Sequence, residues 1–279
     1  MSIRIVQSKQ NARLKELRRA LASPGRSEDG LAGVEGQNLI AEALHARLRI
    51  RCVFVAQGSE RLLDALDLPA DVEVLAMPRE LLDSALATET PQPVAALVET
   101  PDWTWAHVFG DDPSSAALVV VLAELQDPGN LGTIVRSAEA FGADGVVCLP
   151  GTVNPWNPKA VRASAGSVFR LPVLSVGEEE MLEQLRCAGV RVLATTAQGA
   201  QAAEQADLSG AVALVIGNEG NGVPADLAAM ANGAITIPCP GPVESLNAAV
   251  AASVLLYEAA RQRAAKNSAG PRGRHGGTQ

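Results

Sequence analysis

Apolar runs that alternate with helical patterns dominate the chain from residue 117 onward. Runs rich in Ala and Val predict strands, and most stretches between them repeat apolar residues with the spacing of an amphipathic helix. Continuous apolar strands, without polar alternation, are typical of a parallel sheet that helices cover on both faces. We therefore predict an α/β domain with a mostly parallel sheet, whose strands lie at 117–123, 144–149, 171–176, 190–196, 211–216 and 234–238.

The first 100 residues show a similar alternation of helical and strand patterns. Ser8 can cap a helix that runs to about residue 21, with Leu14, Leu17 and Leu21 on one face. A second helical pattern covers 39–44. The spacing of these patterns predicts a smaller α/β domain, with strands at 50–56, 72–76 and 94–98.

A segment rich in Pro, Gly, Asp and Ser separates the two regions. Trp103 and Trp105 lie in this segment; their rings are able to stack on bases, but docking onto a domain surface is the commoner role. The longest helix, 245–266, closes the second region, and the Gly-, Arg- and Ser-rich end has the composition of a disordered tail. The predicted organisation is a first domain at 1–100, a linker at 101–116, a second domain at 117–266 and a disordered tail at 267–279.

The composition is that of a soluble globular protein, with 47% hydrophobic and 19% charged residues among 279. No apolar run approaches the ~18 residues of a membrane span, and the first residues lack the apolar core of a secretory signal. The four cysteines have no metal-ligand spacing, and three of them lie in apolar, strand-like contexts. We therefore interpret them as reduced core thiols of a cytoplasmic protein. They are Cys52, Cys148, Cys187 and Cys239.

The net charge of −8 hides a strong asymmetry along the chain. The first 26 residues carry seven basic groups against Glu16 alone, and 259–279 carry five basic groups and no acid. This leaves 11 of the 23 basic and 30 of the 31 acidic residues for 27–258. A local cluster of basic residues is a better indicator of phosphate binding than the net charge of the whole chain. A solvated helix face and a disordered tail would show the same clustering. The candidate RNA-binding residues are Arg4, Lys9, Arg13, Lys15, Arg18 and Arg19; Arg26 also belongs to the N-terminal cluster.

Three Gly-, Pro- and Asn-rich segments each follow or end an apolar strand. They read D-P-G-N-L-G-T-I-V-R-S-A at 127–138, I-G-N-E-G-N-G-V-P at 216–224 and I-P-C-P-G-P-V-E-S-L-N-A-A at 237–249. Ligands of parallel α/β sheets gather at the carboxyl ends of the strands. The three segments therefore predict one shared pocket.

The common nucleotide and hydrolase motifs are missing from the sequence. Gly129 and Gly132 give G-x-x-G rather than the dinucleotide fingerprint G-x-G-x-x-G, and no G-x-x-x-x-G-K-[ST] occurs. The three histidines are isolated, so neither a histidine metal site nor a Ser/His/Asp triad is easily built. The residues that usually carry out hydride transfer, zinc-dependent hydrolysis and acyl transfer are therefore missing, and we predict no metal site.

The polar residues of the three segments are the remaining candidates for chemistry. Arg136 lies about one turn into a helix and with Asn130 can hold a phosphate or a carboxylate. Glu219 lies between two glycines, where the backbone can approach a ligand closely. Ser245 can cap the last helix while Asn247 points from its first turn. Each residue alone is also explained as a turn, a cap or a solvated charge, so the prediction rests on their co-location.

These residues carry a resemblance to the SpoU (TrmH-type) branch of the SPOUT RNA ribose methyltransferases. The chain shows N-x-G-x-x-x-R-x-A at 130–138, G-N-E-G-x-G at 217–222, and I-P followed by S-L-N at 237–247. The resemblance spans about 117–265. The stretches S-K-Q-N-A-R-L-K-E-L and E-G-x-N-L-I-A-E-A-L near the N-terminus also resemble the substrate-binding extension of this family, a small RNA-binding domain of ribosomal-protein type.

The resemblance implies S-adenosylmethionine as the donor, a ribose 2′-hydroxyl as the acceptor, a trefoil knot and a homodimer. The cofactor's adenine would lie against Gly217, Ile237 and Leu246. Family accounts assign hydroxyl activation to the arginine of the first motif, here Arg136. A guanidinium stays protonated, so phosphate binding and stabilisation of the developing alkoxide is the role we favour.

The remaining catalytic candidates would support Arg136. Asn130 would orient the guanidinium. Glu219 would anchor this arrangement or accept the proton, and Ser245 and Asn247 would position the ribose and the methionine end of the cofactor.

Ribosomal RNA is favoured over transfer RNA because of the N-terminal resemblance. One alternative is a non-catalytic RNA-binding protein that keeps the fold, and another is an unrelated nucleotide-dependent α/β enzyme. The sequence does not name the methylated nucleotide or distinguish a housekeeping role from antibiotic resistance.

Overall fold

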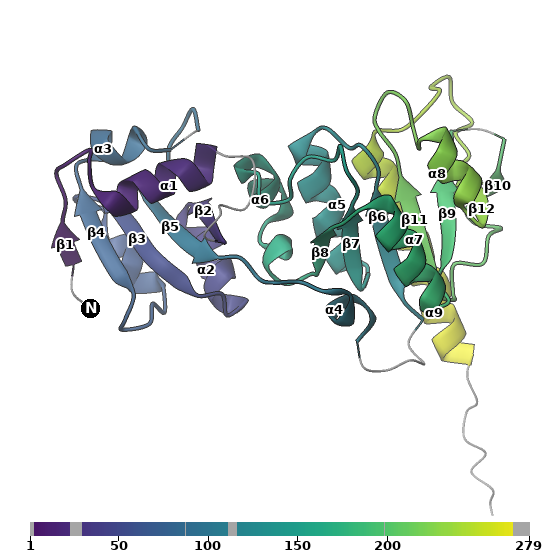
Figure 1. Cartoon of the computed structure of the whole chain (residues 1–279), viewed down its shortest axis with the longest axis horizontal. Coiled ribbons are helices and arrows are strands. Elements are labelled where there is room, and N and C mark those ends of the chain that lie inside the picture. Colours follow the sequence, from purple (N-terminus) through teal and green to yellow (C-terminus); the bar gives the residue numbers. More distant parts are fainter. Residues whose placement is uncertain (1–2, 23–29, 87, 111–115, 198, 270–279) are drawn as a thin grey trace, which may run out of the picture. The chain divides into compact units, whose positions relative to one another are not determined.

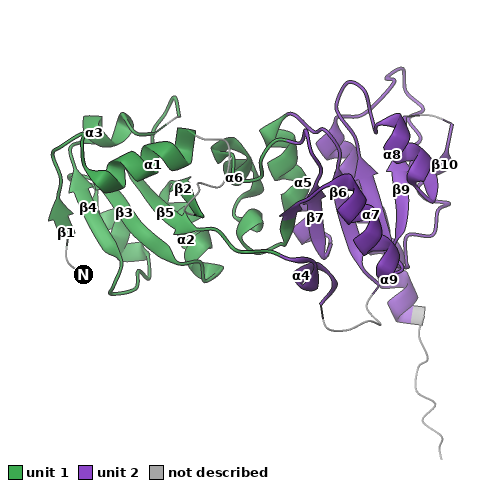
Figure 2. Cartoon of the chain, viewed as in Figure 1, with its two compact units in different colours: residues 1–103, 127–136, 153–173 green, residues 104–126, 137–152, 174–279 purple. Residues whose placement is uncertain are grey.

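The chain forms two compact units, each built around its own β-sheet (Figures 1 and 2). The computed structural model describes residues 3–22, 30–86, 88–110, 116–197 and 199–269. Unit 1 consists of Met1–Trp103, Asp127–Arg136 and Val153–Val173, and unit 2 consists of Thr104–Gln126, Ser137–Thr152 and Leu174–Gln279. Two short segments from the middle of the sequence therefore group with the N-terminal residues.

The sheet of unit 1 has the order β1-β4-β3-β5-β2. Pairing is parallel across β1, β4 and β3, whereas β5 runs antiparallel to both β3 and β2. Strands β3, β4 and β5 confirm the predicted strands to within one residue at every end. The elements are β1 (Ile3–Ile5), α1 (Ala12–Ala22), β2 (Leu31–Glu35), α2 (Gln37–His45), β3 (Ile50–Ala56), a 3₁₀ helix η1 (Glu60–Ala65), β4 (Glu73–Met77), α3 (Arg79–Asp83) and β5 (Val94–Glu99).

Helix α1 packs its leucine face into the core of this unit. Leu14 and Leu17 are fully buried and Leu21 nearly so, as the spacing predicted. Strand β2 was not predicted because Gly33 interrupts its apolar pattern. A Cβ at Gly33 would lie 2.6 Å from the Leu21 side chain, so the glycine makes room for α1.

The start of α1 corrects one prediction. Ser8 Oγ accepts from Gln10 N at 3.1 Å, in a turn before the helix. Asn11 Oδ1 accepts from Leu14 N at 3.2 Å, so Asn11 caps the helix. The N–H of Leu14 lies in the first turn, where backbone N–H groups have no acceptor within the helix.

The sheet of unit 2 has the order β10-β12-β9-β11-β6-β7-β8, and its strands pair in parallel from β10 through to β7. Every residue of β6 and β11 is buried. In Figure 1, α7 crosses in front of these strands and α9 behind them, as expected for a sheet covered on both faces. The strands are β6 (Leu118–Leu122), β7 (Gly145–Cys148), β8 (Val173–Ser175), β9 (Arg191–Thr195), β10 (Gln201–Ala202), β11 (Val212–Ile216) and β12 (Gly233–Thr236).

Six helices and one 3₁₀ helix lie in the remaining described residues. They are α4 (Trp105–Phe109), α5 (Pro128–Ala140), α6 (Pro158–Ser164), η2 (Ser167–Phe169), α7 (Glu178–Cys187), α8 (Ala225–Met230) and α9 (Ala248–Ala269). Together with the sheets, they confirm an α/β fold with a mostly parallel C-terminal sheet. No helix in the described part of the chain is long and apolar enough to cross a membrane.

The predicted linker and tail both contain helical residues. Helix α4 lies in the linker, where Trp105 Nε1 donates to Glu180 Oε1 at 2.9 Å and the Trp105 ring stacks on Phe109. Helix α9 begins at Ala248 rather than 245 and continues to Ala269, so 267–269 are helical rather than part of a tail. The predicted tail from 270 onward, the linker residues 111–115 and Arg26 lie outside the described residues.

Two of the four cysteines are buried as predicted. Burial raises the pKa of Cys52 and of Cys148 to about 12, so both thiols stay protonated at neutral pH. Cys187 is exposed and Cys239 is half-buried, so neither is a core residue.

Candidate functional site

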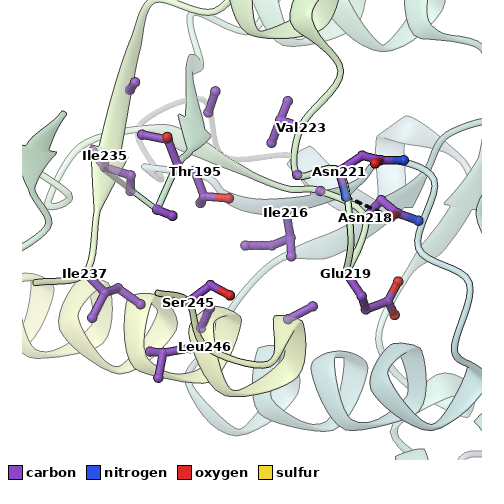
Figure 3. Close-up of a pocket in the computed structure, with 18 of the residues that line it drawn as sticks. Thr195, Ile216, Asn218, Glu219, Asn221, Val223, Ile235, Ile237, Ser245 and Leu246 are labelled. Carbon is purple, nitrogen blue, oxygen red and sulfur yellow. Dashed lines mark hydrogen bonds between the residues drawn. The ribbon is translucent and has the colours of Figure 1, made fainter. Parts of the chain in front are cut away.

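A pocket of about 710 Å³ lies at the carboxyl ends of β9, β11 and β12, three neighbouring strands of unit 2 (Figure 3). Its walls are 194–197 at the end of β9, 216–223 at the end of β11, and Ile235, Ile237 and Cys239 around the end of β12. This is the edge of a parallel sheet where ligands bind, and the volume is within the usual range for small-molecule sites.

The loop after β11 folds tightly back on itself. Asn218 and Gly222 exchange two backbone hydrogen bonds, of 2.9 and 3.0 Å, and Gly222 has a φ of 72°. A Cβ at Gly217 would lie 2.1 Å from the backbone carbon of Gly222, so only glycine fits at this position. The loop therefore presents its backbone, rather than side chains, to part of the pocket.

Asn218 ties this loop to the loop after β6. Its Oδ1 accepts from Gly220 N at 2.8 Å and from Asn221 N at 3.1 Å, while its Nδ2 donates to Glu124 O at 2.9 Å. Gln126 N also points to Glu219 Oε2, at 3.4 Å. Because Gln126 directly precedes residue 127, the first motif segment starts from a loop that contacts the second.

The third segment completes the pocket together with one face of α9. Ile237, Ser245 and Leu246 line it, as do the small residues Ala248 and Ala251 of the helix. In Figure 3 the apolar side chains of Ile216, Ile237 and Leu246 and the polar groups of Ser245 and Glu219 border the same space. Five of the predicted site residues are thus lining residues: Gly217, Glu219, Ile237, Ser245 and Leu246.

Asn247 has a different position from the one predicted. Its Oδ1 accepts from Ala249 N at 2.9 Å and from Val250 N at 3.3 Å, so Asn247, rather than Ser245, caps α9. Ser245 lies two residues before the cap and is exposed at the pocket.

Residues 127–136 of the first motif segment group with unit 1, and Asn130 and Arg136 are not lining residues of the pocket. Asp127 caps α5, because its Oδ1 accepts from Asn130 N at 2.8 Å and Pro128 occupies the first helical position. This backbone hydrogen bond and an ion pair with Lys159 at 3.1 Å hold the pKa of Asp127 below its ordinary value. Arg136 is exposed on α5, and Asn130 is half-buried.

A close helix contact fixes the start of α5 in unit 1. A Cβ at Gly132 would lie 2.3 Å from Ala160 O and 2.6 Å from the Cβ of Ala163, both on α6. The second glycine of the G-x-x-G motif is therefore explained by packing against α6 rather than by phosphate binding.

The charged lining residues among those the structure describes are Glu219 and Glu244, and none is Lys, Arg or His. Negative charge beside apolar walls favours a ligand with a flat apolar ring and a positive group. It disfavours a polyphosphate nucleotide, because the described lining offers the phosphates two carboxylates and no cation. In the described residues, no group of three His, Cys, Asp or Glu side chains could hold a metal ion.

The predicted RNA-binding cluster divides into paired and unpaired cations. Arg4 and Arg13 both form ion pairs with Glu73, at 3.2 and 3.0 Å, and Arg13 also pairs with Glu16 at 2.9 Å. Arg18 donates to Lys9 O at 3.1 Å and to Ser84 Oγ at 3.0 Å. The side chains that remain exposed, with no ion-pair partner in the described part of the chain, are Lys9, Lys15 and Arg19.

Two family models together match most of the chain. The SpoU rRNA Methylase family matches 117–257, and the MRM3-like substrate binding domain matches 11–96. The chain belongs to the SpoU rRNA methylase family. The N-terminal match agrees with the resemblance of the first region to a substrate-binding extension.

Several relatives of this SpoU protein are similar over nearly their whole length. The 23S rRNA (guanosine(2553)-2′-O)-methyltransferase RlmP of Bacillus subtilis is 31% identical over 90% of this chain and 97% of its own. The crystal structure of an AdoMet-bound rRNA methyltransferase from Sinorhizobium meliloti has a TM-score of 0.80 at 31% identity, over 93% of this chain and 98% of that one. The SpoU methyltransferase AviRb from Streptomyces viridochromogenes has a TM-score of 0.81 at 29% identity, over 92% and 99%.

Sequence reasoning missed three features of this SpoU pocket. The residues after β9 carry no motif, and only the sheet order places them at the pocket. Asn218 was quoted in the second segment, but its bonds to two loops depend on the fold. Glu244 was quoted in the third segment without a role, although an acidic residue next to Ser245 was a visible signal.

Proposed function

We propose that this SpoU protein transfers a methyl group from S-adenosylmethionine to a ribose 2′-hydroxyl of ribosomal RNA. The observation that carries the proposal is the pocket at the carboxyl ends of β9, β11 and β12, which gathers two of the family's three motif segments. The similarity to RlmP and to an AdoMet-bound rRNA methyltransferase supports the reaction and the donor. Transfer RNA is the alternative substrate.

The lining residues fit S-adenosylmethionine. Ile216, Ile237 and Leu246 offer apolar surface for an adenine ring, and the tight turn at Gly217 offers backbone groups for its polar edge. Glu219 and Glu244 offer negative charge to a cationic ligand. When bound, S-adenosylmethionine supplies an electrophilic methyl group on a positively charged sulfur, so the protein has only to align and activate the hydroxyl.

Arg136 is the residue that we assign to the RNA side of the reaction. Its exposed guanidinium would bind the phosphate next to the target ribose and stabilise the alkoxide that develops on the 2′-oxygen. It does not act as a base, since it stays protonated. Asn130, six residues earlier on the same helix, would orient it.

Glu219 and Ser245 act on the pocket side. Glu219 would either anchor the Arg136 arrangement or accept the hydroxyl proton. Ser245 would position the ribose or the methionine end of the cofactor. Asn247 would contribute indirectly, since its side chain caps α9 and so sets where the pocket-lining helix begins.

The domains and the location of the protein complete the proposal. Residues 1–100 would bind the RNA substrate and 117–266 would form the methyltransferase domain, with its C-terminal segment threaded as a trefoil knot. The match to a substrate binding domain model at 11–96 supports the first assignment. A cytoplasmic location is expected for an enzyme that modifies ribosomal RNA.

A homodimer is supported by an apolar stripe on α9. Val250, Val254 and Tyr257 follow each other by four and three residues on one helix face, and 49%, 40% and 57% of their surfaces are exposed. Exposed apolar patches of this kind mark protein–protein contacts. A solution mass of about twice 28.9 kDa in sedimentation equilibrium is the expected result.

Replacing Arg136 separates catalysis from cofactor binding. We expect Arg136→Ala to lower methyl transfer to RNA by at least about a hundredfold, because the alkoxide loses its stabilising charge. The Kd for S-adenosylmethionine should stay within about twofold, because Arg136 does not line the pocket. Calorimetry and transfer of a tritiated methyl group measure the two quantities.

Arg186→Ala is the matched control, since it removes an exposed arginine of α7. Loss of cofactor binding in Arg136→Ala would contradict the assignment. A wild-type chain that binds RNA but neither binds nor uses S-adenosylmethionine would support the non-catalytic alternative.

A further inference from the structure

The charged residues of the described pocket lining are all acidic. They are Glu219 and Glu244, and the rest of the described lining consists of apolar residues, glycines, hydroxyl side chains and the amides Asn218 and Asn221. Glu219 already has a place in the proposed catalysis, and its Oε2 accepts from Gln126 N. Glu244 has no such place: it precedes Ser245 in the loop between β12 and α9 and is exposed to solvent. Its charge therefore needs a separate explanation.

Methyl transfer changes the charge of the ligand. A bond forms between the methyl carbon and the ribose oxygen, the bond between that carbon and sulfur breaks, and its electron pair stays on sulfur. The hydroxyl proton leaves to a base or to solvent. The donor thus loses one positive charge and becomes the neutral thioether S-adenosylhomocysteine, while its adenosine and amino-acid parts are unchanged.

Contacts to these unchanged parts cannot distinguish the donor from the product. A fixed negative charge in the pocket wall does distinguish them, because it attracts the sulfonium and has almost no interaction with a neutral sulfur. The effect at an exposed carboxylate is modest and depends on salt, since water and ions screen it.

We infer that Glu244 is a specificity-determining residue that makes the pocket prefer the cationic methyl donor over the neutral product. This inference rests on the proposed function. The described lining contains no Lys or Arg, so no positive charge opposes this preference, and a new donor molecule replaces the product more readily after each transfer.

The test measures the binding of three ligands to the full-length chain by titration calorimetry. S-adenosylmethionine carries the sulfonium, sinefungin carries an ammonium group at the corresponding position, and S-adenosylhomocysteine carries neither. In Glu244→Gln we expect the Kd values of the two cationic ligands to rise about two- to fivefold. The Kd of S-adenosylhomocysteine should change by less than about 1.5-fold.

Two variants control for charge and for position. Glu244→Asp keeps the charge and should keep the wild-type ratio of the Kd values, whereas Glu244→Lys should shift the ratio further than Glu244→Gln does. Glu183→Gln, which removes an exposed acid of α7 outside the lining, should leave all three Kd values unchanged. Raising the ionic strength from about 0.05 M to about 0.5 M should shrink the preference in the wild type.

An equal change for charged and neutral ligands in Glu244→Gln, or no change for any of them, would overturn the inference and leave the proposed function standing. A wild-type chain that binds neither S-adenosylmethionine nor S-adenosylhomocysteine would overturn the proposed function and the inference with it. The two failures are therefore distinguishable in one set of titrations.

Discussion

Gly217 shows how a single residue determines whether the pocket can form. An alanine Cβ would lie 2.1 Å from the backbone carbon of Gly222 and 2.2 Å from the backbone nitrogen of Val223, so the loop would have to open. We expect Gly217→Ala to lower the free energy of unfolding by about 1–3 kcal/mol, as for other overpacked sites. The Kd for S-adenosylmethionine should rise at least about tenfold, because the backbone that lines the pocket moves.

Gly220, in the same loop, is the matched control. A Cβ there would meet the Asn218 side chain at 3.4 Å, an ordinary contact, and the φ of Gly220 is not in the left-handed region. Gly220→Ala should therefore change the unfolding free energy by less than about 0.5 kcal/mol. Denaturant unfolding and calorimetry compare the variants, and equal effects at both positions would contradict the role given to Gly217.

At the residue scale, sequence spacing identified the lining glycine and serine but not every hydrogen bond. Gly217 and Ser245 belong to motif segments that follow strands, and strand ends meet at one sheet edge. The assignment of the α9 cap to Ser245 was wrong, because the choice between Ser245 and Asn247 depends on where the helix turns begin. The cap therefore lies two residues later than predicted, a common difference at helix ends.

Helix α9 is the element that holds the pocket in place, and Arg263 anchors it. Its guanidinium donates to Gly210 O at 2.7 Å, to Ala117 O at 3.2 Å and to Leu208 O at 3.3 Å, and also to Ala116 O. Burial lowers the pKa of Arg263, although the group remains protonated. One half-buried side chain thus connects α9 to the start of β6 and to the segment before β11.

Arg263→Ala should destabilise the protein by about 2–4 kcal/mol, since it leaves several part-buried carbonyls without their charged donor. Arg263→Lys should recover only part of this, because an ammonium cannot reach all of these acceptors with a planar fork. The control is Arg261→Ala, which removes a solvent-exposed ion pair with Glu258 and should leave the unfolding midpoint almost unchanged. Equal unfolding midpoints in urea for the Arg263 and Arg261 variants would contradict the anchor.

At the element scale, the apolar runs were sufficient to locate most strands but not their order. Strand β9 lies between β11 and β12, and this order brings the unmarked residues after β9 into the pocket. The two-residue strand β10 and the three-residue strand β1 are too short to leave a periodic pattern.

Along the sequence, the basic residues cluster near the two ends, and nearly all the acidic residues lie between them. In unit 1 the acids Glu16 and Glu73 neutralise part of the basic cluster, which leaves Lys15 and Arg19 of α1 exposed. We expect Lys15→Ala and Arg19→Ala to weaken RNA binding and to reduce its salt slope by about 0.7–0.9 for each RNA phosphate that the protein no longer neutralises. Arg13→Ala should have a smaller effect on RNA binding, because Arg13 is already paired.

Filter binding of ribosomal RNA at several salt concentrations measures these slopes. A greater weakening of RNA binding in Arg13→Ala than in Arg19→Ala would contradict the division of the cluster into paired and unpaired cations. The thermal unfolding midpoint of each variant provides the control for folding.

At the whole-molecule scale, the sequence predicted the fold class and two alternating regions but not the grouping of the first motif segment. Residues Asp127–Arg136 and Val153–Val173 group with unit 1, although they follow the predicted linker. The contact of Gly132 with α6 holds the two segments to each other, and the ion pair of Arg170 with Glu42 connects the second of them to the N-terminal residues. Both contacts join residues that are far apart in the sequence. A sequence pattern records local periodicity and cannot report such a contact.

Ribose methylation in the cell tests the central claim most directly. Total RNA is mapped from the parent strain, from a strain that lacks the gene, and from that strain complemented with the wild-type chain or with Arg136→Ala. The account predicts that a ribosomal RNA ribose loses its 2′-O-methyl group in the deletion strain and regains it only with the wild-type chain. Identical ribose methylation of ribosomal RNA in all four strains would contradict it.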